Sequence, residues 1–315
     1  MTKIACIGEV MIELAVAPPA PEGTELKALS YAGDTYNTVV TLARLGTQAS
    51  YITRLGDDNY SDAVISRLQA EHIGSENIVR QQGKVPGLYM IHNTPDGERE
   101  FFYWRDRAPA RELFHHEAEV SALEASLADC NMVYLSGITL AIIGDEGRSN
   151  LLSFLRRYKD NGGKVAFDSN YRPRLWQTPE QAQQANRDIL GLTDLALLTL
   201  DDEELLWGTN GDAVGELQHR YANCDIAEIV LKRGSEDVVI LQGQERTTVP
   251  VPKVTNIVDT TAAGDTFNAG YLAAHLEGKS PEQCAQQANR CASVIIRHRG
   301  GVIDKSVFLN EVAER

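Results

Sequence analysis

Short apolar runs alternate with amphipathic helical windows along almost the whole chain, and this alternation is the strongest constraint on its fold. The runs have the length of strands, and the windows repeat their apolar residues at helical spacing. The expected strands are residues 3–8, 49–55, 132–136, 165–168, 194–199 and 228–232. The expected helices include residues 37–45, 61–71, 146–159, 179–190 and 281–297. Such alternation predicts an α/β fold with a mostly parallel sheet flanked by helices. A length of 315 residues fits one large domain with a smaller attachment.

Two segments interrupt the alternation, and we expect them to form a small antiparallel β lid. Residues 9–32 contain short extended runs around the proline-rich break at residues 18–21. Residues 85–108 contain strand-like runs at 87–93 and 99–106, separated by turn-forming residues 94–98. Residues 1–315 are therefore predicted to form one domain that carries the two inserted segments as its lid.

The lid hairpin places tyrosines and an arginine on one face. Tyr103 and Arg105 are two positions apart on a strand and so share a face. With a five-residue loop Tyr89 lies opposite Tyr103, whereas a four-residue loop would place Trp104 there. This face suits a small anion, but it also fits a half-buried sheet face with a surface ion pair.

Charge and composition exclude several classes of partner. A net charge of −14 argues against nucleic acid, because binding a phosphate backbone needs clustered Lys and Arg. Five scattered cysteines without Cys-x-x-Cys spacing are typical of reduced thiols in a cytoplasmic protein. No segment approaches the ~18 apolar residues of a membrane helix, so no membrane partner is expected. The histidines lack metal-ligand spacing, and the sequence identifies no metal ligands.

The stretch from residue 256 to residue 276 carries the most specific chemistry. A β-type run, a turn of small residues and a helical pattern follow one another here. The backbone N–H groups of Ala262, Ala263 and Gly264 fall at a helix start, where they can stabilise a transferring phosphoryl group. Asp265 lies beside them and can accept the proton of an attacking hydroxyl. Alternatively, the negative charge of Asp265 only stabilises the positive end of the helix dipole.

The run Asp259-Thr-Thr-Ala-Ala-Gly-Asp265 resembles the C-terminal signature of the ribokinase-like, or pfkB-type, carbohydrate kinases. Residues 32–37, 42–46 and 56–58 are similar to the N-terminal signature of the same family, so the resemblance covers essentially the whole chain. It implies a ribokinase-like fold and a kinase that uses ATP and Mg²⁺, with Asp265 as the base. It also implies that the N-terminal turn holds the sugar hydroxyls through Gly33, Asp34 and Asn37.

Within the family, the N-terminal turn and the lid residues are most similar to those of kinases that act on 2-keto-3-deoxygluconate. That resemblance implies phosphorylation of the terminal hydroxyl of this sugar acid to give the 6-phosphate. It places the acid end against Tyr89, Tyr103 and Arg105. It also places Arg172 near the substrate or the transferring phosphate, although Arg172 also fits a surface ion pair.

Two other functions compete with this interpretation. One is a neutral-sugar kinase of the same fold, of the fructokinase or ribokinase type. The other is a non-catalytic sugar- or nucleotide-binding protein, which would leave Asp265 and the small-residue turn without a role. Lids of this family often pair across a dimer, and Phe102 and Trp104 on the outer face fit a homo-oligomer formed through the lid.

For ATP, the resemblance implies a site built from strand ends and later helices. Its residues are Ser169, Asn170, Thr199, Lys232, Gly234, Ser235, Gly264 and Asn289. Where many members carry Asn-x-x-Glu, this chain reads Thr199-Leu-Asp-Asp202, so the metal ligands stay open. Asn289 fits either an adenine contact or an ordinary polar position on a helix.

Overall fold

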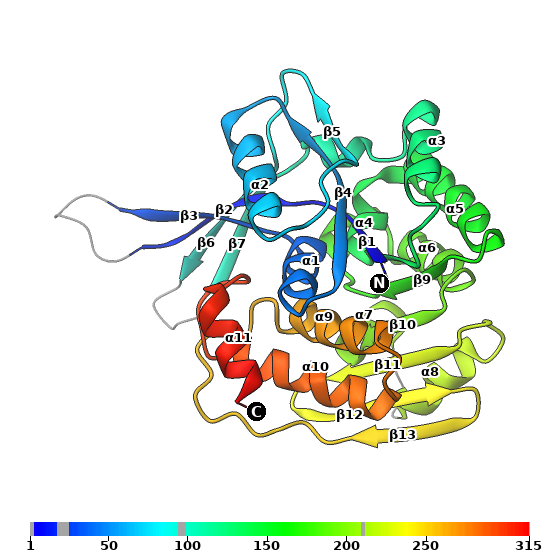
Figure 1. Ribbon diagram of the computed structural model, residues 1–315. Coiled ribbons are helices and arrows are strands. Elements are labelled where there is room, and N and C mark those ends of the chain that lie inside the picture. The colour runs from blue at the N-terminus through cyan, green and yellow to red at the C-terminus, as the bar shows by residue number, and fades with distance from the viewer. Residues whose placement is uncertain (1–2, 18–24, 94–98, 209–211, 315) are drawn as a thin grey trace.

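The computed structural model describes residues 3–17, 25–93, 99–208 and 212–314, and it contains one large and one small sheet (Figure 1). The large sheet has the strand order β13-β12-β11-β10-β9-β8-β1-β4-β5. Its strands are β1 (Lys3–Ile7), β4 (Gln48–Gly56), β5 (Ile78–Gln81), β8 (Met132–Ser136), β9 (Lys164–Asp168), β10 (Leu195–Thr199), β11 (Glu228–Arg233), β12 (Glu236–Gln242) and β13 (Glu245–Val249). Pairing is parallel from β5 to β11, and β12 and β13 extend one edge antiparallel. The predicted mostly parallel sheet is therefore confirmed.

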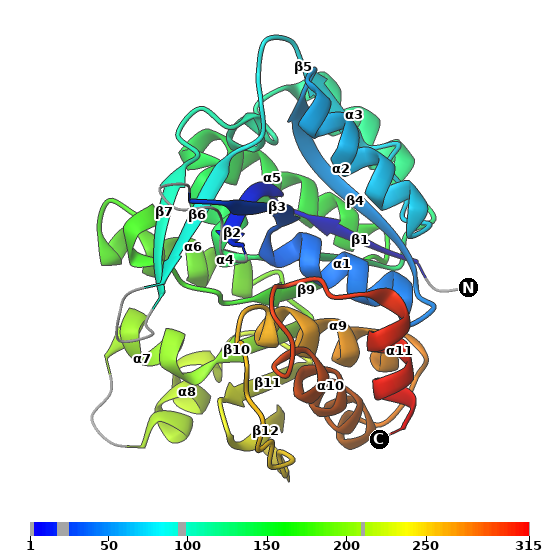
Figure 2. The ribbon, with the colours of Figure 1, turned by 90° about the vertical axis from the view of Figure 1, so that its left-hand side faces the viewer.

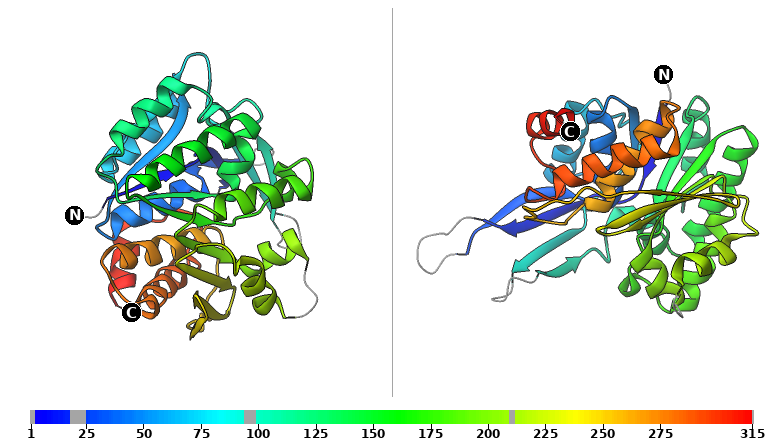
Figure 3. Two further views of the ribbon diagram at one scale, coloured as in Figure 1. Left: turned by 90° about the vertical axis from the view of Figure 1, so that its right-hand side faces the viewer. Right: turned by 90° about the horizontal axis from the view of Figure 1, so that it is seen from below.

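Helices cover both faces of this sheet (Figure 3). The helices of the described residues are α1 (Asp34–Arg44), α2 (Asn59–Ala70), α3 (Glu117–Ser126), α4 (Gly137–Ile142), α5 (Gly144–Asp160), α6 (Pro179–Leu190), α7 (Leu200–Trp207), α8 (Ala213–Tyr221), α9 (Ala263–Leu276), α10 (Pro281–Ile295) and α11 (Lys305–Ala313), with short 3-10 turns η1 (Pro109–Glu112) and η2 (Pro173–Leu175). Alternate residues of β1 show why its sequence is apolar throughout. Ile4 and Cys6 pack into the core under α1, α2, α9 and α10, whereas Ala5 and Ile7 pack into the core under α3 to α6 and α8.

The small sheet is the predicted lid, and it extends from one end of the large sheet (Figures 1 and 2). Its strand order is β3-β2-β6-β7, from β2 (Met11–Val16), β3 (Lys27–Ala32), β6 (Leu88–Asn93) and β7 (Arg99–Trp104). The outer pairs are antiparallel, as predicted, but β2 and β6 pair in parallel. Tyr89 lies opposite Tyr103, which confirms the register of the five-residue loop, and Trp104 pairs with Leu88 instead. The predicted turn residues 18–21 and 94–98 lie outside the described residues.

The strand order reverses its direction beside β1. The chain runs from β1 to β4 and β5 on one side, and later from β8 to β11 on the other. Ligands of open α/β sheets bind beyond the carboxyl ends of the strands at such a reversal. Several polar residues lie at or just after these strand ends, namely Glu9, Ser136, Asp168, Thr199 and Lys232. The lid is inserted after β1 and again before β8, so it adjoins the same end of the sheet.

Two details differ from the sequence-based expectation. Helix α1 begins at Asp34, directly after Gly33, and not at residue 37. Strands β5 and β13 were not among the expected strands. Both are short and only partly buried, so their sequences lack the continuous apolar run that marks the inner strands. Among the described residues, no helix combines the length and hydropathy needed to cross a membrane.

Candidate active site

Asp265 lies in the first turn of α9, where the sequence predicts the base. Its Oδ2 accepts a hydrogen bond of 2.8 Å from Nδ2 of Asn37 on α1. The hydroxyl of Thr38 donates to the backbone oxygen of Asp265 at 3.2 Å and to that of Asp34 at 3.0 Å. Asn37 and Asp265 are 228 positions apart in the sequence, so this hydrogen bond brings the N-terminal and C-terminal signatures into contact.

The start of α9 provides the predicted small-residue turn. Ala262 adopts a left-handed backbone with φ of 59°, which an alanine rarely adopts and which tertiary contacts must maintain. The amide of Ala263 donates to the oxygen of Thr260 at 3.2 Å, so this group closes the turn. A Cβ added to Gly264 would have only the ammonium of Lys232 near it, at 3.9 Å. The helix N-terminus and this ammonium therefore flank the same open space.

We expect Gly264→Val to lower kcat by roughly ten- to a hundred-fold, because a branched side chain would fill the space that an anion needs beside the helix N-terminus. The absence of backbone atoms near this Cβ predicts an intact fold. Steady-state kinetics and thermal unfolding of the variant measure the two effects. Unchanged kcat would show that no phosphoryl group occupies this space.

Lys232 of β11 connects this strand to β9 and to α9, close to Asp265. Its ammonium lies 3.0 Å from Asp168 Oδ1 at the end of β9 and 3.0 Å from Asn268 Oδ1 on α9. The side chain of Asn268 also donates to the hydroxyl of Tyr134 at 3.1 Å. These buried contacts fix a positive charge at the helix N-terminus.

Burial raises the pKa of Asp265 to about 8, the neighbouring carboxylate of Asp34 adds to this rise, and the hydrogen bond from Asn37 opposes it. Asp168 also raises the pKa of Asp265, and Lys232 lowers it. A carboxyl group with a pKa near neutrality is matched to proton transfer at physiological pH, as a general base requires.

Asp34, which the resemblance assigns to the sugar hydroxyls, is bound by protein groups. Its carboxylate accepts hydrogen bonds from the hydroxyl of Ser136, from Nδ2 of Asn170 at 2.9 Å and from the amide of Thr35 at 2.8 Å. Burial raises the pKa of Asp34, and the hydrogen bonds from Ser136 and Thr35 oppose the rise. Asn170, which the resemblance assigns to ATP, thus contacts the N-terminal turn of Gly33, Asp34 and Asn37, here called the sugar-side turn. The φ of Asn170 is 28°, a sparsely populated backbone conformation that surrounding contacts must maintain.

The residues that follow β9 and β10 form a second polar group. The hydroxyl of Ser169 accepts the amide of Thr199 at 3.1 Å and donates to Oδ2 of Asp202 at 3.2 Å. Arg172 lies 3.5 Å from Oδ1 of Asp202 and is half exposed. Burial and the nearby Asp168 raise the pKa of Asp202, and Arg172 opposes them.

The lid contributes aromatic and basic groups. Tyr89 donates its hydroxyl to the buried carboxylate of Glu13, and its ring centroid lies 5.7 Å from that of Tyr103. Burial raises the pKa of Tyr103, whereas three nearby arginines lower it, namely Arg105, Arg172 and Arg174. Two of these arginines are already paired with carboxylates, Arg105 with Glu9 and Arg172 with Asp202, so an anionic ligand would have to share them.

Of the two alternatives for the lid face, an anion site or an ion pair, Arg105 does form an ion pair, but with Glu9 and in a buried rather than a surface position. Gly33 is required beside this pair, since a Cβ there would lie 2.2 Å from the backbone oxygen of Glu9.

Three predicted nucleotide residues lie apart from this network. Gly234 and Ser235 form the turn between β11 and β12. Asn289 is buried in α10 and donates to the oxygen of Pro250 at 3.1 Å. Among the described residues, no hydrogen bond joins these three to the groups around Asp265.

Sequence reasoning missed five polar residues of the site, namely Glu9, Glu13, Ser136, Asp168 and Asn268. The carboxyl-end rule for parallel strands would have singled out the residues that end β8 and β9. Asn268 lies three positions after Asp265, so helical spacing places both on one face of α9.

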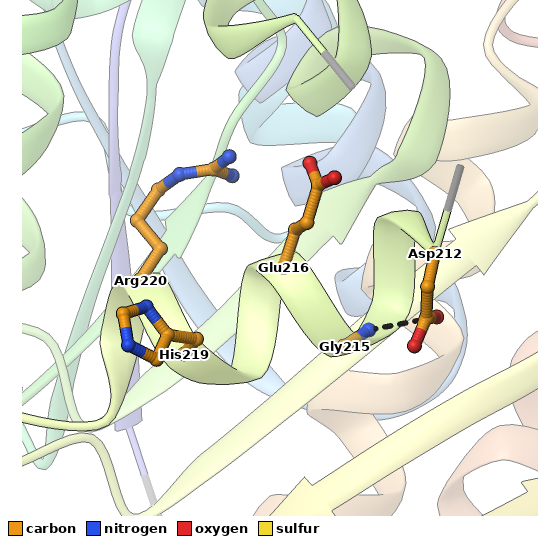
Figure 4. A pocket seen from close by; sticks show the side chains of 5 residues that line it. All are labelled: Asp212, Gly215, Glu216, His219 and Arg220. Atoms are coloured by element: carbon orange, nitrogen blue, oxygen red, sulfur yellow. Dashed lines mark hydrogen bonds between the residues drawn. The ribbon is translucent and has the colours of Figure 1, made fainter. Parts of the chain in front are cut away.

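A separate pocket of ≈ 560 Å³ lies on α8, and no residue described above lines it (Figure 4). Its lining is Asp212, Gly215, Glu216, His219 and Arg220. Asp212 there accepts the amide of Gly215 at 3.0 Å, which is an ordinary helix cap.

Comparisons with known proteins agree with this geometry. The pattern of the pfkB family carbohydrate kinases matches residues 1–306. The chain is 41% identical to a 2-dehydro-3-deoxygluconokinase of Dickeya dadantii over 308 residues, covering 96% of both proteins. It is 41% identical to a protein of the same name from Escherichia coli strain K12 over 313 residues, covering 97% of this chain and 98% of that protein. A crystal structure of fructokinase with bound ATP from Xylella fastidiosa superposes with a TM-score of 0.83 at 22% identity, covering 99% of this chain and 98% of the other. With its two signatures joined at Asp265, the chain belongs to the pfkB family of carbohydrate kinases.

Proposed function

We propose that this protein transfers the γ-phosphate of ATP to the terminal hydroxyl of 2-keto-3-deoxygluconate, giving the 6-phosphate. The observation that carries the proposal is the position of Asp265 in the first turn of α9, where Nδ2 of Asn37 joins it to the N-terminal turn of Gly33, Asp34 and Asn37 by a hydrogen bond of 2.8 Å. The names of the 41%-identical relatives and the arginines around Tyr103 support a sugar acid as the substrate.

The mechanism follows from the residues of the site. Gly33 and Asn37 hold the sugar, while Asp34 fixes the turn that carries them. Tyr89, Tyr103, Arg105 and Arg172 bind the acid end. Asp265 takes the proton of the attacking hydroxyl, and the start of α9 with Lys232 stabilises the charge that develops on the phosphoryl group. Ser169, Asn170 and Thr199 form the wall between sugar and nucleotide, and Gly234, Ser235 and Asn289 bind the nucleotide farther from the reacting atoms.

Mg²⁺ is the expected partner of ATP, and it neutralises phosphate charge when bound. Within the described residues, no group of three or more His, Cys, Asp or Glu side chains forms a metal site. This agrees with Mg²⁺, which is usually held by one or two carboxylates together with phosphates and water. Asp202 is the carboxylate that fits best, because burial and the neighbouring carboxylate of Asp168 both raise its pKa, and a cation would offset both effects.

An ADP-release assay across sugars and sugar acids tests the proposal. We expect the highest kcat/KM for 2-keto-3-deoxygluconate and weak turnover of fructose and ribose. Preference for a neutral sugar would favour the fructokinase- or ribokinase-type alternative, which the shared fold with a fructokinase allows. ATP binding without turnover of any sugar would favour a binding protein.

We also propose that the outer face of the lid pairs with a second copy of the chain. One row of apolar residues crosses this face, Leu29-Leu14-Met90-Phe102. In the neighbouring row, Tyr31 and Ile12 are buried in the core of the main domain and Trp104 is exposed. Trp104 is 58% exposed, and Phe102, Leu29 and Val16 are also exposed. Contiguous apolar surface of this kind marks interaction sites.

We expect Trp104→Glu to weaken self-association at least about tenfold, because buried tryptophans are frequent hot spots of interfaces. Light scattering coupled to gel filtration should show the mass falling to that of one chain. Leu205→Glu, which changes an equally exposed apolar residue on α7, is the matched control and should keep the wild-type mass. A wild-type protein that is a monomer at all concentrations would contradict the proposal.

A further inference from the structure

The junction between the lid and the large sheet is built around Glu9. This residue lies where the chain leaves β1 for β2, and Arg105 lies where the chain returns from β7. A Cβ on Gly33 would lie 2.2 Å from the backbone oxygen of Glu9, and a Cβ on Gly87 would lie 2.9 Å from its Oε1. Glu9 therefore contacts every chain segment that joins the lid to the main domain.

At this junction Glu9 and Arg105 form a buried ion pair. Their side chains are only 2% and 7% exposed. Oε1 of Glu9 and Nε of Arg105 are buried, and neither has a hydrogen-bond partner within the part of the chain that the structure describes. Burial raises the pKa of Glu9, and Arg105 works in the opposite direction. A buried charge needs a counter-charge, so removing one member leaves the other uncompensated.

This pair changes the electrostatics of the lid site. An unpaired arginine in a low-dielectric crevice would attract any small anion. Here Glu9 already balances Arg105. Asp34 of α1 also faces Glu9 and adds negative charge, whereas Arg111 of η1 adds positive charge. A ligand carboxylate must therefore share Arg105 with Glu9, which favours only an acid that is also held through its hydroxyls.

We propose that Glu9 determines the anion selectivity of this site: as the permanent counter-ion of Arg105, it excludes simple inorganic anions and admits an acid that the sugar turn also binds. Glu9 is a positioning residue that acts through Arg105. The inference rests on the proposed function, because it takes a sugar acid as the ligand that Arg105 meets.

Sulfate is the probe that tests this idea without turnover. In Glu9→Gln the guanidinium loses its counter-charge, so we expect sulfate to bind at least about tenfold more tightly than to wild type, because close like charges oppose binding strongly. Thermal unfolding across a sulfate titration measures this binding. The double variant Glu9→Gln/Arg105→Gln is the matched control and should return to the wild-type response. Equal sulfate binding by Glu9→Gln and wild type would overturn the proposal, and so would tight binding that persists in the double variant.

A second comparison covers the case in which Glu9→Gln does not fold. Arg105→Gln leaves Glu9 without a counter-charge, so above the pKa of Glu9 its carboxylate repels an acid, whereas the double variant has a neutral pair. By calorimetric titration we expect the double variant to bind 2-keto-3-deoxygluconate about tenfold more tightly than Arg105→Gln, with fructose affinity unchanged. Equal affinity of the two variants for the acid would overturn the role of Glu9. Failure of the kinase activity itself would appear separately, as wild-type enzyme that binds but does not phosphorylate.

Discussion

Asp265→Asn is expected to lower kcat by about 10²–10⁴-fold, because asparagine keeps the shape of the side chain but cannot take up the proton. Nδ2 of Asn37 can still donate to an amide oxygen at position 265, so the fold and ATP binding should persist. Single-turnover kinetics and nucleotide titration measure the two properties. Asp201→Asn replaces an exposed carboxylate in the first turn of α7 and serves as the matched control, with turnover close to wild type. More than a tenth of the wild-type rate in folded Asp265→Asn would exclude Asp265 as the base.

The same variant should be more stable than wild type, by an amount that depends on pH. The folded pKa of Asp265 is about 8, above the ordinary 3.8, so ionising this group weakens the folded state. The loss begins as pH rises through the unfolded pKa and is complete above the folded one. Asparagine does not ionise. The gain in Tm should therefore be absent near pH 4 and grow towards pH 8. A pH-independent difference in Tm would contradict the raised pKa.

Arg105→Ala is expected to lower kcat/KM for 2-keto-3-deoxygluconate by about ten- to a hundred-fold, the contribution of a charge-assisted hydrogen bond. Any weak turnover of neutral sugars should stay, because these have no carboxylate. Arg105→Lys should recover only part of the loss, since lysine supplies charge without the planar fork. Both substrate types are assayed on one preparation.

The ion pair with Glu9 supplies the competing explanation for this variant. If Arg105 serves only to join the lid to the main domain, its loss should affect acid and neutral sugars equally. That result would leave Arg105 structural and favour a neutral-sugar kinase.

The fold could be predicted because its signals are local. Inner strands such as β8 and β9 are buried on both faces, so their sequences are continuous apolar runs. The register of the lid hairpin was limited to two alternatives by turn length, and the pairing of Tyr89 with Tyr103 decides between them. Asp265 could be located because strand, small-residue turn and helix follow one another in sequence.

The contacts within the site could not be predicted in the same way, because each depends on elements distant in sequence. From the sequence, Asp34 is expected to bind the sugar hydroxyls. In the structure its carboxylate accepts hydrogen bonds from Ser136 and Asn170, which follow it by 102 and 136 positions. The sequence allows an ion pair at Arg105 but does not identify its partner, because Glu9 precedes it by 96 positions. No local pattern records which charges are already neutralised by such partners.

The raised pKa of Asp265 has a further consequence for the enzyme when ATP is bound and no sugar is present. Because burial raises the pKa of Asp265 to about 8, its carboxyl group is mainly protonated at neutral pH. In that state it cannot draw a proton from a water molecule that enters beside bound ATP. The burial that costs the folded state stability would in this way also limit hydrolysis of bound ATP until a sugar arrives.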